Sequence, residues 1–270
     1  MTPTRNHTAA ATARLMNLNL RFGLAEDGPN NWRFRSRAYP ALLAKYPCDF
    51  YAFQEANGFQ IDFLAGLLEG YDCIGRRSPA PDRWQNNVIF FHRRWRCTLD
   101  RHIYLSDTPH IESKYADSRW PRQCTLGKFV CSDRKVTCVT THFDFDADVQ
   151  RRSALLIRQQ INKISNNDPV LLAGDFNCAP GSACYTAFTD RNAAPGPEFS
   201  NAFDPPPYAG TYHGFSGTGD APPIDWILYR GEIEIHGAQV IEQAFDGFYP
   251  SDHFPLLAEF VWPNPMDTPV

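Results

Sequence analysis

The chain has 270 residues, of which 43% are hydrophobic and 21% are charged, as in a globular protein with a sizeable core. Its formal net charge of −4 argues against tight non-specific binding to nucleic acid. No apolar run reaches the ~18 residues of a membrane-spanning helix. Residues 1–13 also lack the apolar stretch of a secretory signal, so we expect a disordered tail there and a cytoplasmic protein.

Strands and helices are both predicted in the first half of the chain. Apolar runs and alternation predict strands at 14–20, 49–54, 71–75, 87–91, 95–99, 125–131 and 136–141. Amphipathic patterns predict helices at 35–45 and 58–69.

The second half continues this alternation. A helix over 147–164 is predicted from apolar residues at spacings of three and four, namely Ala154, Ile157, Ile161 and Ile164. Further elements are a strand at 169–174, a helix at 182–189, a long loop at 192–222, and strands at 224–230, 232–242 and 255–262. Strands mixed with helices indicate an α/β or α+β protein, with a single domain over 14–262 and a second tail at 263–270.

Eight cysteines are spread along the chain. None form a C-x-x-C pair or stand with histidine at zinc-ligand spacing, so we expect no structural zinc. Cys131 and Cys138 flank a predicted turn and are placed to face each other across a hairpin. Without a secretion signal, free thiols are favoured over a disulfide.

Polar residues interrupt the pattern where predicted strands begin or end. They are Asn19, Glu55, His142, Asp175, Asn177, Asp225, Asp252 and His253. Each one alone is explained as a turn former or a core histidine. Together they indicate a functional crevice, because side chains at strand ends converge in layered sheet proteins.

The types of these residues suggest metal-assisted hydrolysis at phosphorus. Asn19, Glu55, Asp175 and Asp252 offer hard oxygen ligands, which suit magnesium (Mg²⁺) or manganese (Mn²⁺). An imidazole held by a carboxylate has a fixed tautomer and stabilises the imidazolium form.

Six motifs, read in order, resemble the endonuclease/exonuclease/phosphatase (DNase I-like) superfamily. They are "NLNLR", "FQEA", "TTHFDF", "LLAGDFN", "IDWIL" and "SDHFP". The resemblance implies a four-layer α/β sandwich, in which two mixed β-sheets pack face to face with helices on the outside. "WPRQC" and "GTYHGFSG" are most similar to the generic bacterial metal-dependent hydrolases of this group. "QEAN" and Arg21 depart from the abasic-site endonucleases, and "GDLNYR" of the inositol phosphatases is missing.

The resemblance also implies a metal site. Glu55 is implied as the principal ligand of Mg²⁺ or Mn²⁺, with Asn19 and Asp252 completing or supporting the site.

Five further residues are implied as the catalytic set. Asp175 and Asn177 would position the attacking water and the phosphate, and His142 would be a second phosphate contact. His253, backed by Asp225, would serve as acid–base or charge stabiliser. The catalytic base is either Asp175 or the His253–Asp225 pair, and the residues leave both open.

Substrate contacts are predicted with less support from the motifs. They are Arg21, Asn87, Trp120, Arg122 and His213. For the last three, a capped surface loop with a packed tryptophan is an equal alternative.

We therefore expect a monomeric phosphoester hydrolase dependent on Mg²⁺ or Mn²⁺, a phosphodiesterase or nuclease acting on short single-stranded nucleic acid or small phosphoesters. One alternative is a phosphomonoesterase on a sugar, inositol or lipid phosphate, and another is a silent phosphate-binding module. Clumps of arginine at 33–37, 76–77, 93–96 and 151–152 are more often solvated faces than binding patches.

Overall fold

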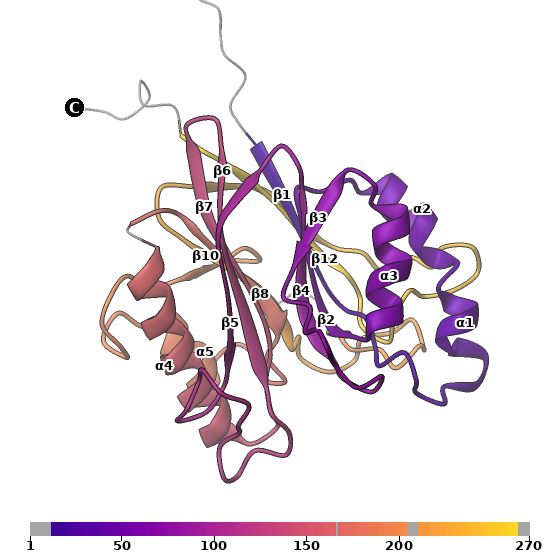
Figure 1. Cartoon of the computed structure of the whole chain (residues 1–270), viewed down its shortest axis with the longest axis horizontal. Coiled ribbons are helices and arrows are strands. Elements are labelled where there is room, and N and C mark those ends of the chain that lie inside the picture. The colour runs from indigo at the N-terminus through magenta and orange to yellow at the C-terminus, as the bar shows by residue number, and fades with distance from the viewer. Residues whose placement is uncertain (1–11, 166, 205–209, 264–270) are drawn as a thin grey trace, which may run out of the picture.

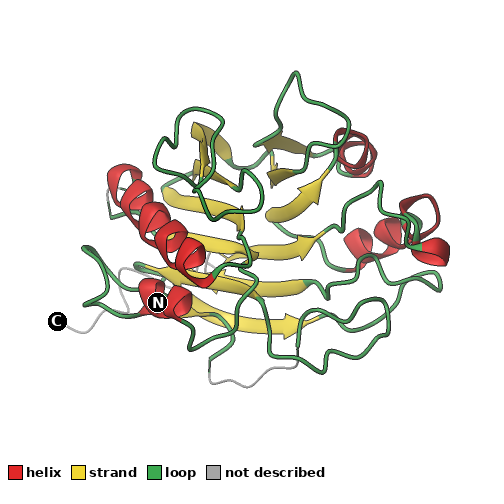
Figure 2. Ribbon diagram, turned by 90° about the horizontal axis from the view of Figure 1, so that it is seen from below, coloured by secondary structure: helices red, strands yellow, loops and turns green. Residues whose placement is uncertain are grey.

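Two mixed six-stranded sheets pack face to face in a computed structural model that describes residues 12–165, 167–204 and 210–263. Figure 1 shows α1–α3 on the outer face of one sheet and α4 and α5 on the outer face of the other. Figure 2 shows the same strands enclosed between helices on either side. The predicted four-layer sandwich is confirmed.

The spatial order of the strands in each sheet differs from their order along the chain. The first sheet consists, from edge to edge, of β11 (Glu234–Val240), β12 (Leu256–Val261), β1 (Thr12–Asn19), β2 (Phe50–Ala56), β4 (Asn86–His92) and β3 (Tyr71–Ile74). The second consists of β5 (Arg96–Tyr104), β6 (Gln123–Cys131), β7 (Arg134–His142), β8 (Val170–Asp175), β10 (Asp225–Arg230) and β9 (Ser200–Asn201). The helices are η1 (Gly28–Asn30), α1 (Trp32–Arg35), α2 (Ala38–Lys45), α3 (Gly58–Leu67), α4 (Ala147–Ile164) and α5 (Ala183–Thr189).

Each sheet has one parallel strand pair at its centre. In the first sheet, β1 runs parallel to β2, and antiparallel partners follow on both sides. In the second sheet, β7 runs parallel to β8 with antiparallel partners on both sides as well. The carboxyl ends of these two central pairs bring polar side chains to one edge of the sandwich.

Alternation along each strand divides the core into three layers. On β1, Leu15 faces the second sheet, whereas Met16 and Leu18 face the helices. On β8, Leu171 also points between the sheets, and Leu172 packs under α4 and α5. Burying both faces of these strands explains their continuous apolar runs.

Several element boundaries differ from the predicted ones. The predicted helix at 35–45 begins only at Ala38, because a separate short helix, α1, ends at the buried Arg35 and the chain turns at Ser36. β5 extends to Tyr104, beyond the predicted strand at 95–99, because it pairs along its whole length with β6. β9 lies inside the predicted loop at 192–222. Thr12 and Ala13 of the predicted tail belong to β1, while residues 1–11 and 264–270 lie outside the described residues.

The hairpin between β6 and β7 corrects the prediction for its cysteines. Cys131 is opposite Arg134, and Cys138 is opposite Gly127, so the two thiols do not face each other. All eight cysteines carry free thiols. Among the described helices, none has the length and apolar character needed to cross a membrane.

Candidate active site

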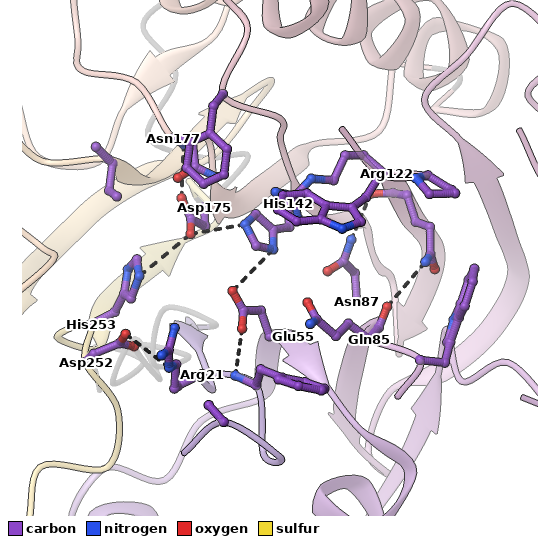
Figure 3. A pocket seen from close by; sticks show the side chains of 18 of the residues that line it. Arg21, Glu55, Gln85, Asn87, Arg122, His142, Asp175, Asn177, Asp252 and His253 are labelled. Atoms are coloured by element: carbon purple, nitrogen blue, oxygen red, sulfur yellow. Dashed lines mark hydrogen bonds and ion pairs between the residues drawn. The ribbon is translucent and has the colours of Figure 1, made fainter. Parts of the chain in front are cut away.

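Strand ends from both sheets supply the polar residues of one site. Asn19 ends β1 and Glu55 is the penultimate residue of β2, while His142 ends β7 and Asp175 ends β8. Asp225 begins β10 next to Asp175, and Asp252 and His253 shortly precede β12. Figure 3 shows side chains from both sheets pointing toward one another.

Three residues at this edge adopt a left-handed backbone conformation. The φ angles are 60° at Arg21, 57° at Glu55 and 51° at Asn177. Glu55 also lies at a register shift between Phe53 and Ala56, where β2 leaves its pairing with β4. Such conformations cost about 1–3 kcal/mol each and concentrate at functional sites.

The carboxylate of Glu55 is fixed by two donors. Its Oε2 accepts a hydrogen bond from the backbone N–H of Phe22 at 2.6 Å, and its Oε1 accepts one from Asn19 Nδ2 at 3.2 Å. Asn19 Oδ1 in turn accepts the N–H of Arg21 at 2.8 Å. Asn19 therefore orients Glu55 through its amide nitrogen.

Asp175 is a buried carboxylate at the centre of the site. Its Oδ2 accepts a hydrogen bond from Asn19 Nδ2 at 2.9 Å, and its Oδ1 accepts the N–H of Asn177 at 3.0 Å. His142 Nε2 lies 3.4 Å from Oδ2. Burial, followed by the nearby Asp225 carboxylate, raises the pKa of Asp175 to about 7.

His253 forms a close pair with Asp225. Its Nδ1 lies 2.8 Å from Asp225 Oδ2, and its Nε2 lies 3.8 Å from Asp175 Oδ2. Burial lowers the pKa of His253, but Asp225, Asp175 and Asp252 outweigh it and raise this pKa to about 10. The imidazolium form is thus favoured.

His142 has the opposite electrostatic environment. Burial, reinforced by the cations Arg122 and His253, holds its pKa well below the usual range. Its Nδ1 lies 3.9 Å from Glu55 Oε1. A neutral imidazole at this position donates a hydrogen bond without carrying charge.

Hard oxygen donors in the pocket fit a magnesium or manganese ion. Glu55 and Asp252 both line the pocket, with Asn19 behind Glu55. A second set, Asp175, Asp225 and His253, has donor atoms within 4.8 Å of one another. Because His253 and Asp225 already share a hydrogen bond at 2.8 Å, that second set fits proton transfer better than metal ligation.

The site opens into a pocket of about 730 Å³. Of the predicted substrate contacts, Arg21, Asn87, Trp120 and Arg122 line this pocket. His213 does not line the pocket. Its ring instead stacks on that of Phe254, with the two ring centroids 3.9 Å apart.

The pocket is also lined by residues outside the predicted site residues. They are Phe22, Ala25, Arg83, Trp84, Gln85, Pro121, Gln123, Phe145, Tyr212 and Ile224. Phe145 and Tyr212 belong to the motifs "TTHFDF" and "GTYHGFSG". Each lies within three residues of a predicted site histidine, but this proximity in sequence does not show that the ring faces the pocket.

Known proteins with this fold carry different activities. A probable 3′-5′-exoribonuclease subunit, Ccr4 of the CCR4-Not complex of Encephalitozoon cuniculi, is 24% identical over 87% of this chain. The match covers 57% of the length of that relative.

Two solved structures from Bacteroides thetaiotaomicron share the fold. An endonuclease/exonuclease/phosphatase family protein superimposes with a TM-score of 0.85 at 23% identity, over 94% of this chain and 99% of the other. The mannosyl-6-phosphatase Bt3783 superimposes with a TM-score of 0.83 at 23% identity, over 93% and 100%. The sequence model of the endonuclease/exonuclease/phosphatase family matches residues 16–253, and the chain belongs to this family of hydrolases.

Proposed function

We propose that this protein hydrolyses phosphoesters with the help of Mg²⁺ or Mn²⁺. The observation that carries the proposal is the buried Asp175 carboxylate, held by Asn19 and Asn177 with His253 at 3.8 Å. A base, a cation and an oxygen ligand set then face one pocket, as hydrolysis at phosphorus requires.

In this mechanism Asp175 is the base. A carboxylate whose pKa is raised to about 7 accepts a proton from water near neutral pH. The water oxygen forms a bond to phosphorus, and the ester P–O bond breaks with its electrons on the leaving oxygen. His253, as an imidazolium, donates a proton to that oxygen or stabilises its charge. The raised pKa of His253 favours Asp175 over the His253–Asp225 pair as the base.

Glu55 and Asp252, supported by Asn19, would hold the metal ion. When bound, a divalent cation polarises the phosphoryl oxygen and stabilises the leaving oxyanion. His142, kept neutral by its surroundings, donates a hydrogen bond to a phosphate oxygen.

For the substrate we propose short single-stranded nucleic acid or another small phosphoester. The similar proteins include an exoribonuclease subunit and a sugar phosphatase, so the family alone does not select one of these. The size of the pocket and its aromatic lining suit a nucleotide-sized ligand.

Metal removal tests this proposal. We expect the protein to cleave bis(p-nitrophenyl) phosphate or an oligonucleotide with Mg²⁺ or Mn²⁺, and to stop when EDTA is in excess. Re-addition of the metal should restore turnover. Equal turnover after thorough chelation would contradict the metal-dependent mechanism.

A further inference from the structure

Exposed aromatic rings lie on both sides of the catalytic residues. On one side, Tyr212 is 47% exposed and its ring centroid lies 5.2 Å from that of His253. On the other side, Trp120 and Phe145 are 46% and 59% exposed, and their ring centroids are 6.4 Å apart. All three rings line the pocket.

These two aromatic groups are separated by the catalytic centre. Figure 3 places His253 and Arg122 at opposite ends of a row that has Asp175 and His142 between them. Tyr212 contacts the His253 end. Trp120 and Phe145 contact the other end, with ring centroids 5.2 and 5.9 Å from the Arg122 guanidinium.

Arg122 is a largely buried cation at the wall of the pocket. Its side chain is 10% exposed, and its Nε has no hydrogen-bond partner among the described residues. The nearest carboxylate oxygen, Asp144 Oδ2, is 3.9 Å away and already accepts from Ser118 Oγ and the Arg119 N–H. The carboxylates of Asp175, Asp144 and Glu55 act on Arg122 electrostatically, but its Nε is left without a hydrogen-bond acceptor, which an anionic ligand in the pocket would supply.

Trp120 is held in place rather than left loose. The Arg119 guanidinium lies 4.5 Å from its ring centroid, and Arg119 does not line the pocket. A fixed ring beside the Arg122 guanidinium suits a ligand that carries a phosphate and a planar ring, because bases stack on aromatic side chains irrespective of sequence.

We propose that the preferred substrate is a phosphodiester with a planar ring on each side of the phosphate, as in one step of single-stranded nucleic acid. Arg122 contacts the phosphate, one base lies against Trp120 and Phe145, and the other lies against Tyr212. Hydrolysis adds water across one P–O bond, and the products are an alcohol and a phosphomonoester. This substrate class rests on the proposed phosphoester hydrolysis.

A phosphomonoester can contact only one of the two aromatic groups. It has an organic group on only one side of the phosphate, so either Tyr212 or the Trp120–Phe145 pair stays in water. Paired bases in a duplex are stacked on each other and cannot reach either group of rings.

Kinetics on three substrates test the proposal. The substrates are the dinucleotide TpT, the methyl ester of thymidine 5′-phosphate, and mannose 6-phosphate, each with Mg²⁺. Wild-type kcat/KM should be highest on TpT. Trp120→Ala and Tyr212→Ala should each lower it on TpT by about 5- to 100-fold, because each removes one stacking surface. The one-ring methyl ester should respond strongly to only one of the two variants.

Conservative and unrelated variants provide the controls. Trp120→Phe and Tyr212→Phe keep a ring and should retain most of the turnover of TpT. Phe59→Ala removes a ring that is 39% exposed, contacts Trp32 and does not line the pocket, so it should leave kcat/KM unchanged.

Two results would overturn the diester assignment while leaving phosphoester hydrolysis intact. One is faster wild-type turnover of mannose 6-phosphate than of TpT, and the other is an equal loss on all substrates in both alanine variants. If the wild type cleaves no phosphoester at all, the proposed function fails and the diester assignment fails with it.

Discussion

His253 Nε2 lies 3.8 Å from Asp175 Oδ2, and the pKa values of both groups are raised. A raised pKa removes negative charge from the aspartate but keeps positive charge on the histidine. For the carboxyl group, burial and a neighbouring carboxylate raise the pKa to about 7, so that the carboxylate needed for a base is still present at neutral pH. For the imidazole, three surrounding carboxylates favour the cation. A base that titrates near neutrality and a permanent cation are thereby placed together, which is a common way to divide proton transfer from charge stabilisation.

Substitution of either residue should remove most of the activity. We expect Asp175→Asn and His253→Ala each to lower kcat by about 10²-fold or more, since one acid–base group contributes ~10²–10⁴-fold. Steady-state kinetics with saturating Mg²⁺ measure this. Near-normal turnover by either variant would show that its role has been assigned wrongly.

The dependence of turnover on Mg²⁺ concentration distinguishes the proposed metal ligand Glu55 from the proposed catalytic residue His253. Glu55→Gln should raise the Mg²⁺ concentration needed for half-maximal turnover, because it weakens a proposed ligand. His253→Ala serves as the matched control and should leave that concentration nearly unchanged while kcat falls.

At the scale of elements, the site depends on how closely β7 and β8 approach. Gly174 is paired with Thr141, and the next pair along the ladder is His142 and Asp175. A Cβ at position 174 would lie 2.3 Å from the Thr141 carbonyl oxygen. Because that contact involves backbone atoms, the two strands must separate to relieve it. His142 and Asp175, the next pair along the ladder, would then move as well.

Gly174→Ala should therefore impair both stability and turnover. We expect the free energy of unfolding to fall by about 1–3 kcal/mol, as for other overpacked sites, and kcat to fall with it. Gly237→Ala in β11 is the matched control, because a Cβ there meets no atom within 4 Å. Denaturant unfolding of both variants decides the question, and a stable, active Gly174→Ala protein would contradict it.

Element prediction succeeded where a pattern is local and failed where distant contacts decide. The apolar face of α4, with Ala154, Ile157 and Ile161, follows from helical spacing alone. The break after Arg35 does not, because its cause is distant. Arg35 donates hydrogen bonds to the carbonyl oxygens of Pro250 and Arg21, at 2.7 and 3.0 Å.

In the candidate site, the acids and histidines could be predicted from the sequence, but the aromatic residues of the pocket could not. Acids and imidazoles at strand ends stand out against apolar strands, so Glu55 and Asp175 were found. Tyr212 and Phe145 sit in loops, where an exposed aromatic side chain looks the same in sequence as a packed one. Only the fold shows that both rings face one pocket.

At the scale of the whole molecule, three of the four arginine clumps, at 76–77, 93–96 and 151–152, are paired with carboxylates. Ion pairs join Arg76 to Asp62, Arg93 to Asp72 at 2.9 Å, and Arg152 to Asp107 at 3.0 Å. With a net charge of −4, the chain as a whole does not offer a basic field to a long polyanion.

Duplex DNA should therefore be a poor substrate. We expect weak binding and slow nicking of supercoiled plasmid at ~0.15 M salt, with faster turnover of short single strands under the same conditions. Gel assays of plasmid and labelled oligonucleotides, run in parallel, compare the two. Efficient plasmid nicking with the oligonucleotides untouched would refute this expectation.

The pairing of β1 with β12 has a consequence for biosynthesis. Thr12 is opposite Val261, so strands from the two ends of the described chain lie side by side. During translation, β1 with Asn19 leaves the ribosome before β12 is made, and His253 is among the last of the proposed catalytic residues to leave it. A nascent or prematurely terminated chain thus lacks part of the candidate site, and the proposed hydrolysis requires that synthesis of the domain be nearly finished.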